Sequence, residues 1–311
     1  MKQDTSNAEL GEAIEYIMLT SPPDYFRPAL LSFCSRAVGG TQDTTIPIAT
    51  SMVLFARAIG IHDDIIDGSK RKNQHTTVFG KFGRDTALIL ADILLMKGYT
   101  QLRNFLLLNI PRERIVRVLD VIDTVWFEQS EGGINEIQDR GKTNITPQKC
   151  LKKIWMIASE TEAITKIGSI LGVGSNKETE KLGEYGRLLS VAYILRNELI
   201  DMLDLKALRH RIRHESLPLP LIYALQDSLT KPKLLSLISQ KKLTPEILKQ
   251  ILQAVNNVGG MVYGAKIIEG TVNDACSCIN MLKFGDSLNA LNYLAKTALI
   301  AQEDLHTAQN I

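Results

Sequence analysis

The sequence predicts an all-α protein. Apolar residues recur at helical spacing, Thr-Pro pairs have the form of helix starts, and no run of strand-like alternation is present. The 311 residues are 45% hydrophobic and 23% charged, and no composition shift or low-complexity tract divides them. We therefore expect a single domain over residues 1–311, with residues 1–10 loosely ordered. Many helices joined by short loops predict a bundle around a central apolar cavity.

The individual helices follow from local patterns. Residues 113–127 carry an apolar stripe at helical spacing, although several of them are β-branched. Thr146 before Pro147, and Thr244 before Pro245, predict an N-cap followed by proline in the first turn. Helix-breaking residues divide the chain into roughly ten helices. The breaks are expected at residues 21–23, 39–41, 68–75, 132–133, 172–177, 206–216 and 259–260.

Composition excludes several classes of function. The net charge of +2 indicates no nucleic-acid partner. No apolar run reaches the ~18 residues of a membrane span, and the polar start predicts no signal peptide, so we expect a cytoplasmic protein. The four cysteines lack zinc-type spacing and are expected to be reduced structural thiols.

A first acidic segment, "IHDDIIDGSKRK", places Asp63, Asp64 and Asp67 in an apolar helical stretch. On a helix, positions 63 and 67 share a face and position 64 lies about 100° away, so the three carboxylates are expected to converge. Such carboxylates repel each other unless a cation separates them, and Mg²⁺ suits carboxylate and phosphate oxygens. They are therefore the candidate catalytic residues. The alternative is a solvated helix end with local ion pairs.

A second acidic segment repeats this spacing with Asn197, Glu198 and Asp201. A basic segment follows each acidic one, and it supplies candidate diphosphate-binding cations. These candidates are Arg71 and Lys72 after the first segment and Lys206 and Arg209 after the second. Two acidic segments with adjacent cations would form two walls of one site. Such a site predicts loss of a diphosphate leaving group, with metal ions stabilising the developing charge. Apolar surroundings suit a substrate with a hydrocarbon tail.

The stretch "HDDIIDGSKRKNQHTTVFGKFGRDTALILADILL" resembles the first aspartate-rich region of the trans-isoprenyl diphosphate synthases, the polyprenyl synthetase family. "RNELID" stands where the second aspartate-rich region belongs, and "SLPLPLIYAL" resembles the segment after it. The resemblance covers residues 20–300 approximately. It implies an isoprenoid-synthase (terpenoid synthase) helical bundle and a prenyltransferase that forms a homodimer or a heteromer.

The resemblance also implies the cofactor and the reaction. Roughly three Mg²⁺ ions, which Mn²⁺ can replace, would grip the diphosphate of an allylic prenyl diphosphate substrate. Asp63 and Asp67 carry over directly as metal ligands, whereas Asn197, Glu198 and Asp201 carry over only by position. Ionisation would give an allylic cation, which isopentenyl diphosphate attacks in isoprenoid biosynthesis.

The expected site for isopentenyl diphosphate departs from the family pattern. Arg27 is kept, but Pro23, Asp24 and Tyr25 stand where the family has Gly, Lys and Arg. A diphosphate needs cationic donors, so this site is expected to be degenerate. Two alternatives to the synthase therefore stay open. One is a terpene-synthase-like lyase or prenyl transfer to a different acceptor, and the other is a non-catalytic subunit of a heteromeric synthase.

Other positions bear on the allylic site and on product length. The Lys-Thr pair that contacts the allylic diphosphate in the family is missing at residues 156–157, unless Lys152 or Lys153 replaces it from a neighbouring turn. The spacing of Glu162 and Lys166 predicts an ion pair between surface or rim charges. By resemblance, the floor under the growing chain is formed by Phe55, Ala58 and Ile59. The alternative for these three is ordinary core packing.

Overall fold

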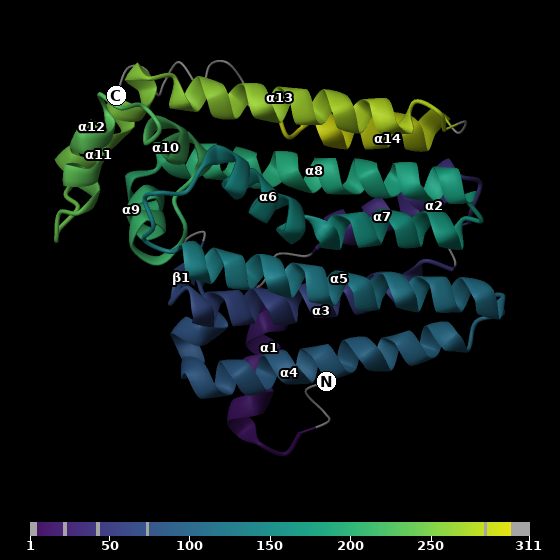
Figure 1. Cartoon of the computed structure of the whole chain (residues 1–311). Helices are drawn as coiled ribbons and strands as arrows, with labels where there is room; N and C mark the ends of the chain where they lie inside the picture. The colour runs from purple at the N-terminus through teal and green to yellow at the C-terminus, as the bar shows by residue number, and fades with distance from the viewer. Residues whose placement is uncertain (1–4, 21–23, 42–43, 73–74, 283–284, 300–311) are drawn as a thin grey trace.

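The computed structural model describes residues 5–20, 24–41, 44–72, 75–282 and 285–299, and these are mostly helical (Figure 1). The first seven helices are α1 (Ala8–Thr20), α2 (Phe26–Ala37), α3 (Ile46–Ile66), α4 (Val78–Leu106), α5 (Arg112–Asp139), α6 (Pro147–Ile157) and α7 (Ser159–Leu171). The others are α8 (Asn176–Leu203), α9 (Leu205–His214), α10 (Leu219–Ala224), α11 (Lys231–Ile238), α12 (Pro245–Asn257), α13 (Gly260–Ile279) and α14 (Gly285–Lys296). Within these residues, the only strands are β1 (Arg71–Lys72) and β2 (His75–Thr76), an antiparallel pair. The predicted all-α class is confirmed.

The predicted helix starts are confirmed. The side chain of Thr146 accepts a hydrogen bond from the backbone N–H of Lys149, with an O···N distance of 3.2 Å, and Pro147 follows at the first helical position of α6. At the start of α12, Thr244 accepts one from the N–H of Ile247. These bonds satisfy backbone donors that the first turn leaves unpaired, so each helix begins where its N-cap stands.

Two predicted breaks were wrong. Helix α5 continues through residues 132–133. Gly132 stands there because α6 packs closely against it: a Cβ atom at this position would lie 3.0 Å from Cγ1 of Ile157. The basic segment 206–216 is mostly α9, which buries Leu208 and Ile212 one turn apart. The described residues contain fourteen helices, more than the roughly ten expected.

The long helices run side by side, and the short helices gather at one end of the bundle (Figure 1). Helix α8 packs against α7 and α13, whereas α3 packs against α4. A large buried cluster joins most of the helices, and Tyr185 within it donates a hydrogen bond to the carbonyl oxygen of Leu291 at 2.7 Å. A smaller cluster joins α1, α3 and α4. The site lies where α3, α5, α6 and α8 face one another near the short α9.

Several expectations concern the chain as a whole. Part of the expected loose stretch, residues 1–4, lies outside the described residues, and α1 already begins at Ala8. No described helix combines the length and apolarity that crossing a bilayer requires. All four cysteines are free thiols. The organisation as one domain and the cytoplasmic location stay predictions.

Candidate active site

A cavity of about 570 Å³ lies between the two acidic segments. Its polar lining includes Asp63, Asp67, Glu198, Lys153 and Arg211. Its apolar lining comes mainly from α3, α5, α6 and α8 and consists of Ile59, Ile66, Trp126, Ile134, Ile137, Ile154, Ile157 and Ile194. One cavity therefore carries both charged groups and a hydrocarbon surface.

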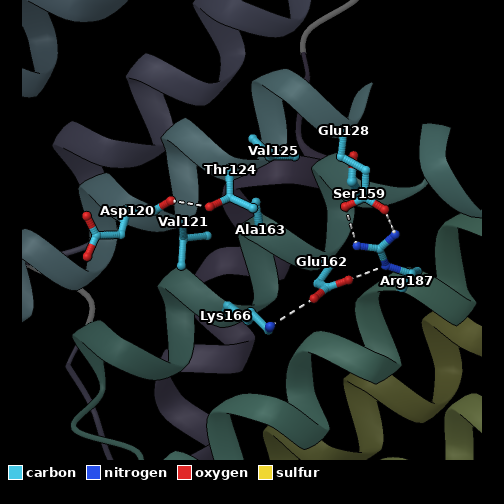
Figure 2. Close-up of a pocket in the computed structure, with 10 residues that line it drawn as sticks. All are labelled: Asp120, Val121, Thr124, Val125, Glu128, Ser159, Glu162, Ala163, Lys166 and Arg187. Atoms are coloured by element: carbon cyan, nitrogen blue, oxygen red, sulfur yellow. Dashed lines mark hydrogen bonds and ion pairs between the residues drawn. The ribbon is translucent and has the colours of Figure 1, made fainter. Parts of the chain in front are cut away.

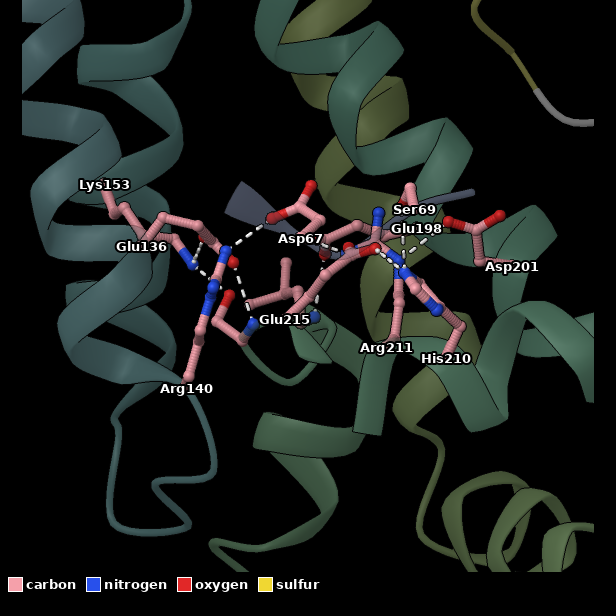
Figure 3. Close-up of polar contacts among 12 residues, drawn as sticks. Asp67, Ser69, Glu136, Arg140, Lys153, Glu198, Asp201, His210, Arg211 and Glu215 are labelled. Carbon is pink, nitrogen blue, oxygen red and sulfur yellow. Dashed lines mark hydrogen bonds and ion pairs between the residues drawn. The ribbon is translucent and has the colours of Figure 1, made fainter. Parts of the chain in front are cut away.

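The three aspartates of the first acidic segment point to different partners. Asp63 lines the cavity, Asp64 lies 2.9 Å from Nζ of Lys72, and Asp67 pairs with Arg140 at the end of α5 (Figure 3). No three His, Cys, Asp or Glu side chains of the described residues are grouped so that they could hold a metal ion. The expected convergence of all three carboxylates was therefore wrong, because the turn of the helix directs Asp64 toward Lys72.

Asp63 lies in an environment that disfavours its charge. Burial raises the pKa of its carboxyl to about 6; Lys72 lowers this pKa, and the charges of Asp67 and Asp64 raise it further. No ion pair joins Asp63 to another described residue. A cation at the cavity mouth would reverse the shift, since a nearby positive charge favours the carboxylate.

The second acidic segment is neutralised by the protein itself. Asp201 accepts a hydrogen bond from Nε of Arg211 at 2.7 Å, and Glu198 lies 3.6 Å from Nη1 of the same side chain (Figure 3). Glu198 is 3% exposed, whereas Asn197 is exposed and does not line the cavity. Of the three expected ligands, only Glu198 therefore reaches the cavity wall.

The cations that line the cavity differ from most of those expected. Lys206 and Arg209 are exposed on α9 and are not part of the lining, and Arg71 is exposed on β1. Lys72 is half-exposed and pairs with Asp64. The lining cations are instead Arg140, Lys153 and Arg211. Arg211 could have been predicted from the helical spacing of α9, since this residue lies beside Leu208 and Ile212 on the buried face of the helix.

Lys153 occupies the region of the missing Lys-Thr pair. Its side chain is 4% exposed and contacts Glu136 and the hydroxyl of Ser216. Burial lowers the pKa of the Lys153 amine, but the charges of Glu136, Cys150 and Glu198 and the hydrogen bond to Glu136 together outweigh this and hold the pKa above its usual value. The amine therefore stays charged at the cavity wall.

The residues expected to form the floor lie in different places. Ile59 lines the cavity, whereas Ala58 is buried in the smaller cluster with α1 and α4. Phe55 packs edge-on against Trp126 and Tyr99, with ring centroids 5.6 Å and 5.1 Å apart. Trp126 lines both this cavity and a second hollow of about 510 Å³ between α4 and α5. The Trp126 ring therefore stands between the two hollows.

Arg27, the residue kept from the isopentenyl diphosphate site, is held by two carboxylates. Its Nη1 lies 2.7 Å from Asp24, and its Nε lies 2.7 Å from Oε1 of Glu160. The charges of both carboxylates and their hydrogen bonds keep the pKa of Arg27 above its usual value, although burial lowers it. Pro23 lies outside the described residues. The guanidinium is thus already neutralised by the chain.

A separate hollow of about 190 Å³ lies between α5, α7 and α8 (Figure 2). Arg187 donates hydrogen bonds there to Glu128, Glu162 and the carbonyl oxygen of Trp155. The predicted ion pair of Glu162 and Lys166 is confirmed at 2.9 Å. Glu162 and Lys166 are only partly exposed and line this hollow, in agreement with the expected rim charges.

The donor set of the cavity fits Mg²⁺ at the first acidic segment. Asp63 and Asp67 both line the cavity, and Mg²⁺ is usually held by one or two carboxylates together with substrate phosphate oxygens. At the second segment, Glu198 and Asp201 are already occupied by Arg211. At the first segment Asp67 is likewise paired with Arg140, whereas Asp63 faces the cavity, so Asp63 is the carboxylate that best fits a metal ion when a phosphate is present.

An all-α bundle with charged groups at the mouth of an apolar cavity defines a class of proteins that hold an amphiphilic anion. A sequence model of one family, described as polyprenyl synthetase, matches residues 7–255. The chain belongs to the polyprenyl synthetase family and is a prenyltransferase of the trans-isoprenyl diphosphate synthase type.

Individual relatives agree with this assignment. A geranylgeranyl diphosphate synthase of Methanosarcina mazei is 28% identical over 204 residues, which is 64% of this chain and 60% of that relative's own length. A short chain isoprenyl diphosphate synthase of Methanothermobacter thermautotrophicus is 23% identical over 304 residues, or 95% of this chain and 91% of the relative. An octaprenyl diphosphate synthase of Escherichia coli is 22% identical over 306 residues, covering 96% and 92% of the two chains.

Solved structures share the fold. A geranylgeranyl pyrophosphate synthetase from Pyrococcus horikoshii superposes with a TM-score of 0.85 at 23% identity, covering 94% of this chain and 90% of that one. A decaprenyl diphosphate synthase from Rhodobacter capsulatus gives a TM-score of 0.82 at 17% identity, with coverage of 96% and 92%. The predicted isoprenoid-synthase fold is confirmed.

Proposed function

We propose that the protein is a Mg²⁺-dependent prenyl diphosphate synthase that ionises an allylic prenyl diphosphate and condenses it with isopentenyl diphosphate. The observation that carries this proposal is the single cavity, which joins the first acidic segment and buried cations to an apolar wall. An allylic prenyl diphosphate has the matching chemistry, with an anionic head and a hydrocarbon tail. Family membership supports the same class of reaction.

The chain's own residues would bind the two ends of this substrate. Nε of Arg140 is buried and has no hydrogen-bond partner among the described residues, so it is a donor ready for a phosphate oxygen. Lys153 supplies a second buried cation. Asp63 and Asp67 would hold Mg²⁺, which when bound supplies positive charge beside the leaving diphosphate. The isoleucines and Trp126 would surround the tail.

In the proposed reaction, the bond between the allylic carbon and its oxygen breaks, and the electron pair leaves with the diphosphate. The apolar wall keeps water away from the allylic cation. The double bond of isopentenyl diphosphate then forms the new carbon–carbon bond, and a proton is lost from the product. Removal of positive charge from the mouth of the cavity would slow the first step most.

The pairing of Arg27 favours a second candidate function. Two carboxylates, Asp24 and Glu160, hold the one cation kept from the isopentenyl diphosphate site, so this place repels a second diphosphate. The alternative is prenyl transfer to an acceptor without a diphosphate, or loss of a proton in a terpene-synthase-like lyase. Both alternatives keep the ionisation step and change only what meets the cation.

One assay separates these functions. Purified protein is incubated with Mg²⁺ and geranyl, farnesyl or geranylgeranyl diphosphate, with and without isopentenyl diphosphate, and products and released diphosphate are analysed. Longer prenyl diphosphates that form only with isopentenyl diphosphate support the synthase. Hydrocarbon or alcohol products formed without it support the second candidate. No turnover under any condition contradicts the synthase and the lyase and supports the non-catalytic subunit.

We also infer that the protein forms a homodimer. Large apolar side chains are exposed along α4 and α5, among them Ile89, Met96, Val116 and Phe127. Large exposed apolar side chains of this kind are typical of a protein–protein interface. In a homodimer, a second copy of the same chain would cover these side chains. In a heteromer, a related subunit would cover them.

A further inference from the structure

The second acidic segment carries a cation of its own. Arg211 on α9 points toward three carboxylates, and its side chain is 16% exposed (Figure 3). Its Nε lies 2.7 Å from Asp201, and its Nη1 lies 3.6 Å from Glu198 and 3.5 Å from Glu215. One guanidinium therefore contacts all three carboxylates, of which Glu198 and Glu215 line the cavity.

A metal ion at this wall would have to displace the guanidinium. The second oxygen of Glu198 is also engaged, since it accepts a hydrogen bond from the N–H of Leu219 at 2.8 Å. Asn197, the remaining member of the segment, is neutral and exposed. Removal of the carboxylates from Arg211 would leave a buried positive charge without partners, which is strongly unfavourable.

Contacts beyond the carboxylates hold this arrangement in place. Glu215 lies 3.5 Å from Nε2 of His210, which in turn lies 3.2 Å from the hydroxyl of Ser69. Ser69 lies two residues after Asp67 in the first acidic segment, so this chain of contacts links the two acidic segments. At the first acidic segment, Asp67 pairs with Arg140 and Asp64 with Lys72, but no ion pair joins Asp63 to another described residue. The Asp63 carboxylate can therefore bind an incoming cation.

We propose that Arg211 takes the place of a divalent cation at the second acidic segment, so that metal ions bind at the first segment alone. The guanidinium is a permanent charge that needs no metal and matches the geometry of carboxylates and phosphates. The site therefore binds fewer divalent ions than two fully acidic walls would hold. This inference rests on the proposed function only in using a diphosphate as the ligand.

The experiment counts bound Mn²⁺, which serves as a paramagnetic probe, by electron paramagnetic resonance in the presence of inorganic pyrophosphate. Asp201→Asn is expected to bind as many Mn²⁺ ions as the wild type, because Arg211 already occupies that carboxylate. Asp63→Asn is expected to bind fewer. A lower count in Asp201→Asn overturns the inference and leaves the proposed function standing. An unchanged count in Asp63→Asn contradicts the proposed function, and the inference falls with it.

A second part of the experiment looks for additional bound Mn²⁺. In Arg211→Gln, Glu198 and Asp201 lose their cation, so the count is expected to rise by about one Mn²⁺. Arg211→Lys keeps the charge and should retain the wild-type count. Circular dichroism verifies the fold of each variant, and Asp201→Asn decides the question if Arg211→Gln does not fold. A folded Arg211→Gln protein with the wild-type count contradicts the inference.

Discussion

At the residue scale, Arg187 shows how a partly buried network of ion pairs stabilises the bundle. Its guanidinium joins Glu128 on α5 to Glu162 on α7 (Figure 2). It also lies over the ring of Trp155, 5.3 Å from the ring centroid. Arg187 is 8% exposed, so removal of its side chain leaves Glu128 without this partner and leaves Glu162 with Lys166 alone, at a partly buried place.

We expect Arg187→Ala to lower the free energy of unfolding by about 3 kcal/mol at pH 7, measured by chemical denaturation. Lys181→Ala is the matched control. Lys181 pairs with Glu184 in full solvent, so its loss should change the stability very little. Equal effects of the two substitutions would contradict the assigned role of the Arg187 network.

The same comparison has a predictable pH dependence. Burial raises the pKa of Glu162, but the hydrogen bonds and charges of Lys166 and Arg187 outweigh this and hold it below the usual value. A lowered folded pKa stabilises the protein above the ordinary pKa of a glutamate, and this stabilisation is lost as the pH falls through the folded value. The stability difference between wild type and Arg187→Ala should therefore shrink in acid.

Two glycines in α5 show how packing at the scale of an element overrides local sequence signals. Gly132 and Gly133 predicted a break, but the helix continues through both. A Cβ at position 132 would meet Ile157 of α6 at about van der Waals limits or closer, whereas one at position 133 would meet nothing within 4 Å. The sequence pattern could not show that the helix continues here, because the contact with α6 joins residues that are distant in the chain.

We expect Gly133→Ala to raise the free energy of unfolding by about 0.5–1 kcal/mol, since alanine favours the helix and has space. Gly132→Ala should lower it, because the new methyl group must push α6 away. Thermal denaturation of both variants tests this. A stabilised Gly132→Ala protein would show that the close approach of α5 and α6 is not required.

The aromatic residues between α3, α4 and α5 concern product length. Trp126 separates the cavity from the second hollow, and Phe55 packs against its ring. Under the proposed synthase function, Trp126→Ala should yield products longer by one or more isoprene units. The chain's other tryptophan gives a control: Trp155→Ala should leave product length unchanged. Products of unaltered length from Trp126→Ala would show that Trp126 does not limit the length of the product.

At the scale of the whole molecule, the apolar face on α4 and α5 predicts a dimer. Light scattering of the purified protein should give twice the mass of the chain, and Phe127→Glu, at a position 71% exposed, should give a monomer. Leu229→Glu places the same charge at an exposed leucine elsewhere and should leave the dimer intact. A monomeric wild-type protein would contradict the homodimer.

The overall fold was predictable because helical periodicity and N-caps such as Thr146 and Thr244 are local signals. The first acidic segment was found for the same reason. Arg140 could not be found, because it reaches Asp67 from the far end of another helix, more than seventy positions away. Lys206 and Arg209 were chosen by proximity in sequence, whereas the burial of one face of α9 selects Arg211.

The central claim is that the first acidic segment promotes ionisation of an allylic diphosphate. Its most direct test compares the rate of diphosphate release from farnesyl diphosphate, with Mg²⁺ and isopentenyl diphosphate present, between the wild type and Asp63→Asn. The account predicts Mg²⁺-dependent release by the wild type and a loss of about 10²-fold or more in the variant. Release that is equal in the two proteins, or independent of Mg²⁺, would contradict it.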